Sequence, residues 1–187
     1  MPFKFKRLDI PEVVLIEARR FYDDRGHFLE SYQQRAFDQA GITARFVQDN
    51  ASHSRHCILR GLHYQLSPAA QGKLIYAARG EIFDVAVDIR RHSPSFGRCV
   101  SATLNSERDA QMLYMPPGFA HGFCVLSDEA LVLYKTTASY APDQERGIRW
   151  DDPALHIDWP VPSPIVNERD ARLPVLAEAE NDFVYSS

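Results

Sequence analysis

Apolar and polar residues alternate along much of this chain, most clearly in the segment at residues 81–89. Its larger apolar side chains recur at every second position: Phe83, Val85, Val87 and Ile89. The intervening positions carry small or acidic side chains such as Ala86 and Asp88. A period of two is typical of a strand with one buried face, so we expect a half-buried β-strand here.

Short apolar runs recur along the rest of the chain at a spacing of about 8–12 residues. They cover residues 12–17, 45–48, 57–59, 73–78, 98–104, 110–115, 121–126 and 130–137. Turn signals separate several of them: Asp24-Arg25-Gly26, Arg79-Gly80, Ser93-Pro94 and Pro117-Gly118. This spacing predicts an all-β sandwich or barrel, and a jelly roll of this kind can hold a ligand between its two sheets.

Only one segment, Ser31 to Ala40, has a helical pattern, with Ser31 as its N-cap and Gly41 just past its end. From Tyr140 onward the chain is rich in Pro, Asp and Arg. We expect turns and short helices at 140–187, packed on a barrel formed by roughly residues 12–140. No internal repeat or linker is visible, which predicts a single domain over residues 1–187.

The composition fits a folded protein that binds neither membranes nor nucleic acids. The chain has 187 residues, a formal net charge of −4 and 45% hydrophobic residues. Its longest aliphatic run near the start, residues 13–16, is far shorter than the roughly 20 residues of a membrane span. The basic residues are scattered singly or in pairs, whereas a nucleic-acid partner requires clustered cations.

Cysteine usage and the start of the chain predict a cytoplasmic protein. Asp9, Pro11 and Glu12 interrupt any apolar segment of a signal peptide. The odd number of cysteines, Cys57, Cys99 and Cys124, without metal-site spacing, indicates reduced thiols.

Three segments carry candidate chemistry at strand-like positions. His63 follows the apolar run 57–59, and Lys73, one of only four lysines, begins another run. Lysine is seldom fully buried without a partner, although a single histidine in a strand is more often a hydrogen-bonded core residue. His121 follows a tight turn, and the pattern Pro-x-Gly-x-x-His before an apolar strand resembles the second half of the cupin signature.

The first half of that signature is incomplete. Metal-binding cupins have His-x-His followed by a Glu, which together supply three ligands. Here the corresponding residues are His63-Tyr64-Gln65, and no acidic residue lies between Gln65 and Glu81. We therefore predict no metal site.

An ordered set of motifs closely resembles the dTDP-4-dehydrorhamnose 3,5-epimerase family over roughly residues 5 to 175. The motifs are Asp24-Arg25-Gly26, Phe28 and Glu30, residues 46–50, residues 59–65, residues 71–74, residues 80–88, residues 117–123, Leu133-Tyr134-Lys135, Tyr140, residues 148–152, residues 157–160 and Arg169-Asp170-Ala171. The resemblance implies a cupin-like jelly roll and a cofactor-free epimerase. Its substrate would be a nucleotide-linked 4-keto-6-deoxyhexose.

The resemblance also implies four catalytic residues. His63 corresponds to the family's base and Asp170 to the carboxylate that orients it. Lys73 corresponds to the cation near the C4 oxygen, and Tyr134 to the acid that returns a proton from the opposite face. Read from the sequence alone, Asp170 would be a solvated residue and Tyr134 a packing residue.

Further residues correspond to substrate contacts in the family. The resemblance assigns Arg25, Arg60 and Arg169 to the diphosphate, Gln48 and Asn50 to the base edges and Tyr140 to stacking on thymine. The remaining substrate-binding positions are Phe28, Glu30, His121 and Glu145. In this family Arg25 and Glu30 come from the neighbouring subunit, which implies a homodimer that exchanges N-terminal strands.

Three other functions remain open at this point. An epimerase acting at C3 only or at C5 only would share the same His, Asp and Tyr. A non-catalytic sugar-nucleotide-binding cupin would need the pocket without the catalytic residues. A metal-dependent cupin oxygenase or isomerase is disfavoured by the incomplete ligand set.

Overall fold

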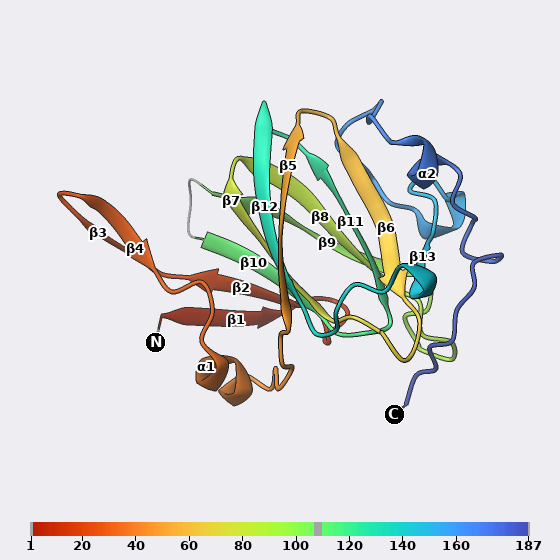
Figure 1. The fold of residues 1–187 in the computed structure, drawn as a ribbon, viewed down its shortest axis with the longest axis horizontal. Helices are drawn as coiled ribbons and strands as arrows, with labels where there is room; N and C mark the ends of the chain where they lie inside the picture. The colour runs from red at the N-terminus through yellow and green to blue at the C-terminus, as the bar shows by residue number, and fades with distance from the viewer. Residues whose placement is uncertain (1, 107–109, 187) are drawn as a thin grey trace.

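Two antiparallel sheets packed face to face make up most of the computed structural model, which describes residues 2–106 and 110–186 (Figure 1). The six-stranded sheet has the spatial order β1 (Phe3–Arg7), β2 (Val14–Ala18), β10 (Ala110–Met115), β7 (Lys73–Arg79), β12 (Glu129–Thr136) and β5 (Gln48–Arg55). The five-stranded sheet has the order β13 (Glu145–Gly147), β6 (Leu59–Gln65), β11 (Phe119–Val125), β8 (Glu81–Asp88) and β9 (Cys99–Asn105). The predicted all-β, cupin-like fold is confirmed.

The main core fills the space between the two sheets. Ile75, Leu113 and Val132 from the six-stranded sheet pack there against Ile82 and Phe123 from the five-stranded sheet. Since side chains alternate along a strand, neighbouring residues of the six-stranded sheet lie on its outer face. There α1 (Gln34–Gln39) covers part of the sheet through the buried Phe37.

The structure corrects the prediction for residues 81–89, because β8 is covered on both faces. Ile82 and Ala86 point into the main core, whereas Val85 and Val87 pack under the C-terminal segment. The sequence pattern indicated one solvated face because it carries small or acidic residues such as Ala86 and Asp88, but both of these and Asp84 are fully buried.

Two further predictions were wrong in detail. The strand predicted at 45–48 is β5, Gln48–Arg55, which is polar because it forms an edge of its sheet. The N-cap of α1 is Gln33, whose side chain accepts a hydrogen bond from Ala36 N, and not Ser31. Gly41 does follow the helix as predicted, with a φ of 83°.

The chain after Tyr140 consists mainly of turns and short helices, as predicted. Its elements are η1 (Pro142–Gln144), β13, η2 (Pro153–Leu155) and α2 (Glu168–Ala171). Leu155 and Phe183 pack on Val85 and Val87, on the face of the five-stranded sheet that points away from the main core. This segment brings α2 against β6.

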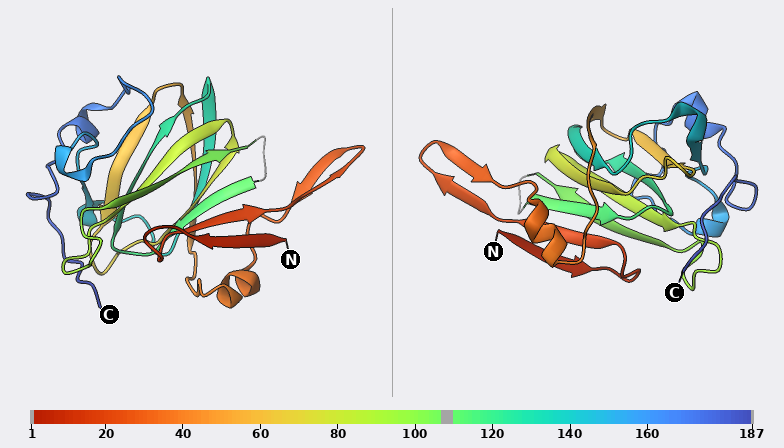
Figure 2. Two further views of the ribbon diagram at one scale, coloured as in Figure 1. Left: turned by 180° about the vertical axis from the view of Figure 1, so that it is seen from behind. Right: turned by 60° about the horizontal axis from the view of Figure 1, so that its bottom comes forward.

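A hairpin near the N-terminus extends away from the two main sheets. It consists of β3 (Arg20–Asp23) and β4 (Gly26–Leu29), neither of which the apolar pattern predicts. Both views of Figure 2 show it projecting beyond the rest of the chain. Its aromatic side chains are exposed: Phe21 by 44%, Tyr22 by 70% and Phe28 by 65%. Among the described helices, none is long and apolar enough to cross a membrane.

Candidate active site

A polar cavity opens between the two sheets on the side of β5 and β6. One part has a volume of about 470 Å³ and is lined by Ser52, Arg60, His63, Lys73, His121, Phe123, Tyr134, Glu145, Asn167, Arg169 and Asp170. A second part of about 300 Å³ is lined by Gln48, Asn50, His63, Tyr64, Gln65, Gln71, Lys73, Tyr134, Thr136, Tyr140 and Glu145. The parts share four residues, so we treat them as one continuous site.

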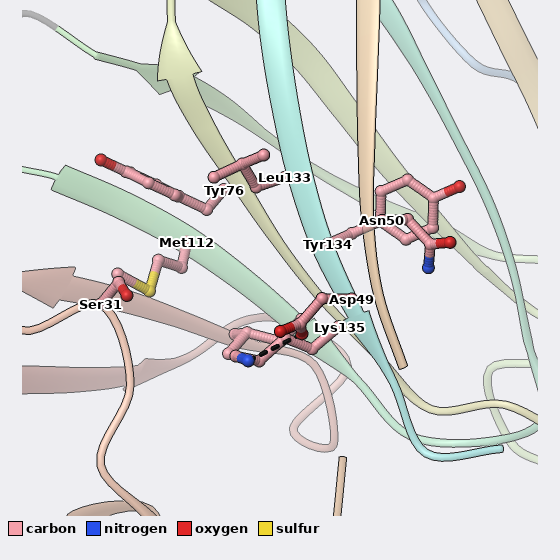
Figure 3. A pocket seen from close by; sticks show the side chains of 9 residues that line it. Ser31, Asp49, Asn50, Tyr76, Met112, Leu133, Tyr134 and Lys135 are labelled. Carbon is pink, nitrogen blue, oxygen red and sulfur yellow. Dashed lines mark hydrogen bonds and ion pairs between the residues drawn. The ribbon is translucent and has the colours of Figure 1, made fainter. Parts of the chain in front are cut away.

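The pleat of the six-stranded sheet decides which side chains reach this site. Tyr134 and Asn50 point to one side of β12 and β5, whereas Leu133, Tyr76 and Met112 lie on the other side (Figure 3). Tyr134 packs partly against the main core and lines the cavity. Burial is the main reason why the pKa of its hydroxyl is raised, which keeps it protonated at neutral pH.

His63 and Asp170 form a hydrogen-bonded pair at the cavity wall. The distance from His63 Nε2 to Asp170 Oδ1 is 2.9 Å, and Gly61 N donates to Asp170 Oδ2 at 3.2 Å. The Asn167 side chain caps α2 by accepting a hydrogen bond from Asp170 N at 2.7 Å, which fixes the carboxylate in place.

The carboxylate of this pair is held in its ionised form. Burial alone would raise the pKa of Asp170, but the hydrogen bond and charge of His63 and the Gly61 N–H together hold it below its ordinary value. An ionised carboxylate only accepts hydrogen bonds, so the neutral form of His63 carries its proton on Nε2 and has its lone pair on Nδ1. His63 therefore has the tautomer that a general base requires.

Gly61 allows the close approach of β6 to β11 that positions His63. Its φ is 133°, and a Cβ at this position would lie 2.5 Å from Gly122 Cα and 2.9 Å from His121 O. Neither the backbone conformation nor the space would accept another residue without strain. Across this contact, His63 lies opposite His121 in the strand register.

Lys73 places a buried cation in the same cavity. Its side chain comes from the first residue of β7, and Nζ donates to the backbone oxygen of His63 at 2.9 Å. Burial lowers its pKa to about 8, against the raising effects of Asp84 and Glu145. Lys73 is therefore still protonated at pH 7. Within the described residues, two of its three N–H donors remain for a bound oxygen.

Asp84 is a residue of this region that sequence analysis missed. It is fully buried and accepts a hydrogen bond from His121 Nε2 at 2.7 Å. Burial raises the pKa of Asp84 and lowers that of His121. The available signal was an acidic residue within the apolar strand 81–89, which is costly to bury without a partner.

A second group of hydrogen bonds is centred on Glu145. Arg169 donates to both of its carboxylate oxygens, at 2.9 and 2.8 Å, and Tyr140 OH donates to one of them at 2.8 Å. Burial would raise the pKa of Glu145, but these contacts hold it below its ordinary value. Gln48 accepts from Tyr140 N and donates to Asn50, each at 2.8 Å. This network lines one end of the cavity with the Tyr140 ring, the Gln48 and Asn50 amides and the Arg169 guanidinium.

Comparison with known proteins gives the family. The family model described as dTDP-4-dehydrorhamnose 3,5-epimerase matches residues 7–178. The chain belongs to this family. It is 54% identical over 179 residues to the dTDP-4-dehydrorhamnose 3,5-epimerase of Pseudomonas aeruginosa, covering 95% of this chain and 98% of that protein.

A crystal structure and a more distant relative extend the comparison. The dTDP-6-deoxy-D-glucose-3,5-epimerase of Legionella pneumophila, solved in complex with dTDP-4-keto-L-rhamnose, has a TM-score of 0.93 and 42% identity, covering 99% of this chain and 100% of that one. The dTDP-4-dehydrorhamnose 3-epimerase of Streptomyces niveus is 37% identical over 179 residues, covering 95% of this chain and 86% of that protein.

Most of the residues assigned from the family resemblance lie together in this member of the family. Eleven line the cavity: His63, Lys73, Tyr134, Asp170, Gln48, Asn50, Arg60, His121, Tyr140, Glu145 and Arg169. The other three, Arg25, Phe28 and Glu30, lie on or next to the β3–β4 hairpin and line neither part of it. Arg25 instead pairs with Asp23 at 2.5 Å on the hairpin's exposed tip.

Proposed function

We propose that this protein inverts C3 and C5 of dTDP-4-keto-6-deoxy-D-glucose to give dTDP-4-keto-L-rhamnose, a step of dTDP-L-rhamnose biosynthesis. The observation that carries this proposal is that His63, paired with Asp170, shares one cavity with Lys73 and Tyr134. These residues provide a base, a fixed cation and an acid.

The chemistry of the substrate explains why these groups are needed. A ketone at C4 acidifies the C–H bonds at C3 and C5, because the electrons left by either proton move onto the C4 oxygen. His63 Nδ1 removes the proton, and the enolate oxygen that forms is stabilised by the Lys73 ammonium. Tyr134 OH then gives its proton to the opposite face of the same carbon. Exchange with solvent then removes the extra proton from His63 and returns one to Tyr134, and the same cycle at the second carbon completes the double inversion.

The remaining cavity residues support binding of the nucleotide diphosphate. The guanidinium groups of Arg60 and Arg169 suit phosphate oxygens, to which they can donate two hydrogen bonds each. Tyr140 offers a ring for stacking on thymine. Gln48 and Asn50 lie beside it, where their amides can read the edge of the base. No metal or cofactor takes part in this proposal.

We further propose that the working unit is a homodimer in which each hairpin completes the partner's site. Arg25, Phe28 and Glu30 lie away from the cavity of their own chain, and the hairpin exposes aromatic side chains to solvent. The outer face of the six-stranded sheet also has a hollow of about 180 Å³, lined in part by Leu74, Met112 and Leu133 (Figure 3). A second copy would cover these apolar surfaces.

Two further points are the location of the protein in the cell and an alternative reaction. We expect a cytoplasmic location, where the free thiols of Cys57, Cys99 and Cys124 stay reduced. The sequence relationship to a 3-epimerase keeps a second candidate open, which is inversion at one carbon only.

Incubation of the protein with dTDP-4-keto-6-deoxy-D-glucose in heavy water tests the proposal. Deuterium at both C3 and C5 of an inverted product is expected. Deuterium at one carbon only would establish a single-site epimerase. Binding of the sugar nucleotide without any exchange would leave a non-catalytic binding protein and overturn the proposal.

A further inference from the structure

A second histidine–carboxylate pair lies at the cavity wall: His121 lines the cavity, and the buried Asp84 is hydrogen-bonded to it. The proposed reaction assigns this pair no proton transfer. Asp84 on β8 and His121 on β11 are both buried, and they are joined by the 2.7 Å hydrogen bond described above. Only one carboxylate oxygen has a partner: Asp84 Oδ2 is buried without a hydrogen bond among the described residues. This is unusual, because buried carboxylate oxygens are normally paired.

A buried carboxylate with one free oxygen requires a positive charge nearby. Neutral His121 provides a hydrogen bond but no full charge, and burial lowers its pKa and so favours that neutral form. Lys73 is a buried cation that lines the cavity beside His121 and comes from the opposite sheet. Its Nζ donates to the backbone oxygen of His63, which lies opposite His121 in the strand register. Of the charges around Lys73, that of Asp84 acts most strongly to keep it protonated, followed by that of Glu145.

We propose that Asp84 is a positioning residue, whose carboxylate balances the buried Lys73 ammonium while it fixes the orientation of His121. This inference rests on the proposed function for its catalytic meaning, because Lys73 is the group assigned to the C4 oxygen. A neutral amine would stabilise the enolate far less than an ammonium does. Asp84 therefore acts through Lys73 and does not need to touch the substrate.

Other charged and titratable groups also face this region, and the test must separate their effects from that of Asp84. They are Arg60 and His63 on β6, His121 on β11, Tyr134 on β12, Glu145 on β13, and Arg169 and Asp170 on α2. Glu145 is already engaged by Arg169 in two hydrogen bonds, so its charge is largely balanced. Within the described part of the chain, Asp84 has no such arginine partner.

The lysine content makes a direct measurement possible. The chain has only four lysines, Lys4, Lys6, Lys73 and Lys135, so protein labelled with carbon-13 at lysine Cε should give few NMR signals. A Lys73→Arg variant assigns the signal of interest. In the wild-type protein, Lys73 should titrate near pH 8 and be charged at pH 7.

The test variant is Asp84→Asn, which removes the charge at nearly constant volume. We expect the pKa of Lys73 to fall by about 1–3 units, the usual effect of losing a nearby opposite charge. The control is Asp49→Asn, because Asp49 pairs with Lys135 at 2.7 Å outside the cavity. It should leave the Lys73 titration unchanged. An unchanged Lys73 pKa in Asp84→Asn would overturn the proposal.

Turnover adds a second readout. Activity should be lost as rising pH deprotonates Lys73, so a lower pKa moves this alkaline limb of the kcat profile to lower pH. From a pKa of about 8, a fall of about 1–3 units should lower kcat at pH 7 by about twofold to about a hundredfold, while KM changes little. Asp84→Glu keeps the charge and should restore a Lys73 pKa near the wild-type value. A purely structural role for Asp84 would lower activity without moving the limb.

One outcome separates this inference from the proposed function. If the wild-type protein does not epimerise but the pKa of Lys73 still falls in Asp84→Asn, the function is wrong and the charge coupling stands.

If Asp84→Asn does not fold, the titration of the wild-type protein tests the inference instead. A neutral Lys73 or a protonated Asp84 at pH 7 would overturn it.

Discussion

At the scale of single residues, two histidine–carboxylate pairs in opposite electrostatic settings present a histidine to the cavity. Asp170 accepts hydrogen bonds from both His63 and Gly61 N, and its pKa is lowered. Asp84 has one hydrogen-bond partner and complete burial, and its pKa is raised. The lowered pKa of Asp170 keeps an ionised carboxylate beside His63, which suits His63 for the role of base.

Replacing His63 by Ala should remove deuterium incorporation at both C3 and C5. A positioned base contributes about 10²–10⁴ to the rate, so the exchange should fall by at least that factor. Affinity for dTDP should change little, because the proposed nucleotide contacts are other residues. Mass spectrometry of the recovered sugar and calorimetry with dTDP measure the two effects. Exchange at the wild-type rate would show that another group is the base.

Replacing Tyr134 by Phe should separate deprotonation from inversion. His63 would still form the enolate and return a deuteron to the face from which the proton left. Deuterium would then enter substrate of unchanged configuration, while inverted product falls sharply. The ring shape is kept, so no core cavity explains the loss. If the variant epimerises at nearly the wild-type rate, Tyr134 is a packing residue.

The sequence was most informative for residues that lie within ordered motifs. His63, Lys73 and Asp170 could be assigned by resemblance, although they come from β6, β7 and α2. Asp84 stood in one of the same motifs, but its position suggested a solvated strand face. Its burial depends on the C-terminal segment and on the opposite sheet, and neither could be placed from local periodicity.

At the scale of secondary structure, the apolar pattern predicted the strands with apolar faces and missed those without them. β10 was predicted at its observed bounds, 110–115. β5 is polar on both faces because it is an edge strand whose inward side chains line the cavity. Among the described residues of the β3–β4 hairpin, only Leu29 at the end of β4 packs against a core cluster, so little imposes alternation. Edge strands and hairpins of this kind depend on pairing partners that a local pattern does not contain.

The close contact between β6 and β11 gives a prediction about stability. Gly61→Ala should be much more destabilising than Gly26→Ala, although the two glycines have similar φ values of 133° and 127°. Both changes strain the backbone by about 1–2 kcal/mol. Only Gly61 faces backbone atoms within 3 Å, whereas Gly26 has nothing within 4 Å. Gly61→Ala therefore adds an overpacking cost of about 1–3 kcal/mol.

Urea unfolding of both variants measures this difference. The midpoint should drop clearly further for Gly61→Ala, with a loss of epimerase activity as His63 shifts relative to His121. Equal losses of stability in the two variants would mean that β6 can move away from β11 at no cost.

At the scale of the whole molecule, the reaction is expected to proceed without metal. Across residues 2–106 and 110–186, no three His, Cys, Asp or Glu side chains are placed to hold an ion. The proposed enolate is stabilised by Lys73 instead. Activity after exhaustive chelation should equal that of untreated protein, measured alongside metal analysis of the purified sample. Stoichiometric zinc, iron or nickel whose removal stops turnover would contradict this expectation.

The proposed exchange of hairpins predicts that two defective variants restore each other's activity. Arg25→Ala removes a side chain that would serve the partner's site, and His63→Ala removes the base from a chain's own site. Each homodimer should be impaired. After the two proteins are mixed, unfolded and refolded together, half of the dimers should be mixed. In each mixed dimer, one cavity has His63 from one chain and Arg25 from the other. About a quarter of all sites should then be intact.

If each chain instead completed its own site, every cavity in the mixture would still carry one defect and no activity would return. Light scattering on the same samples gives the assembly state, and a fully active monomer would rule out the exchange directly.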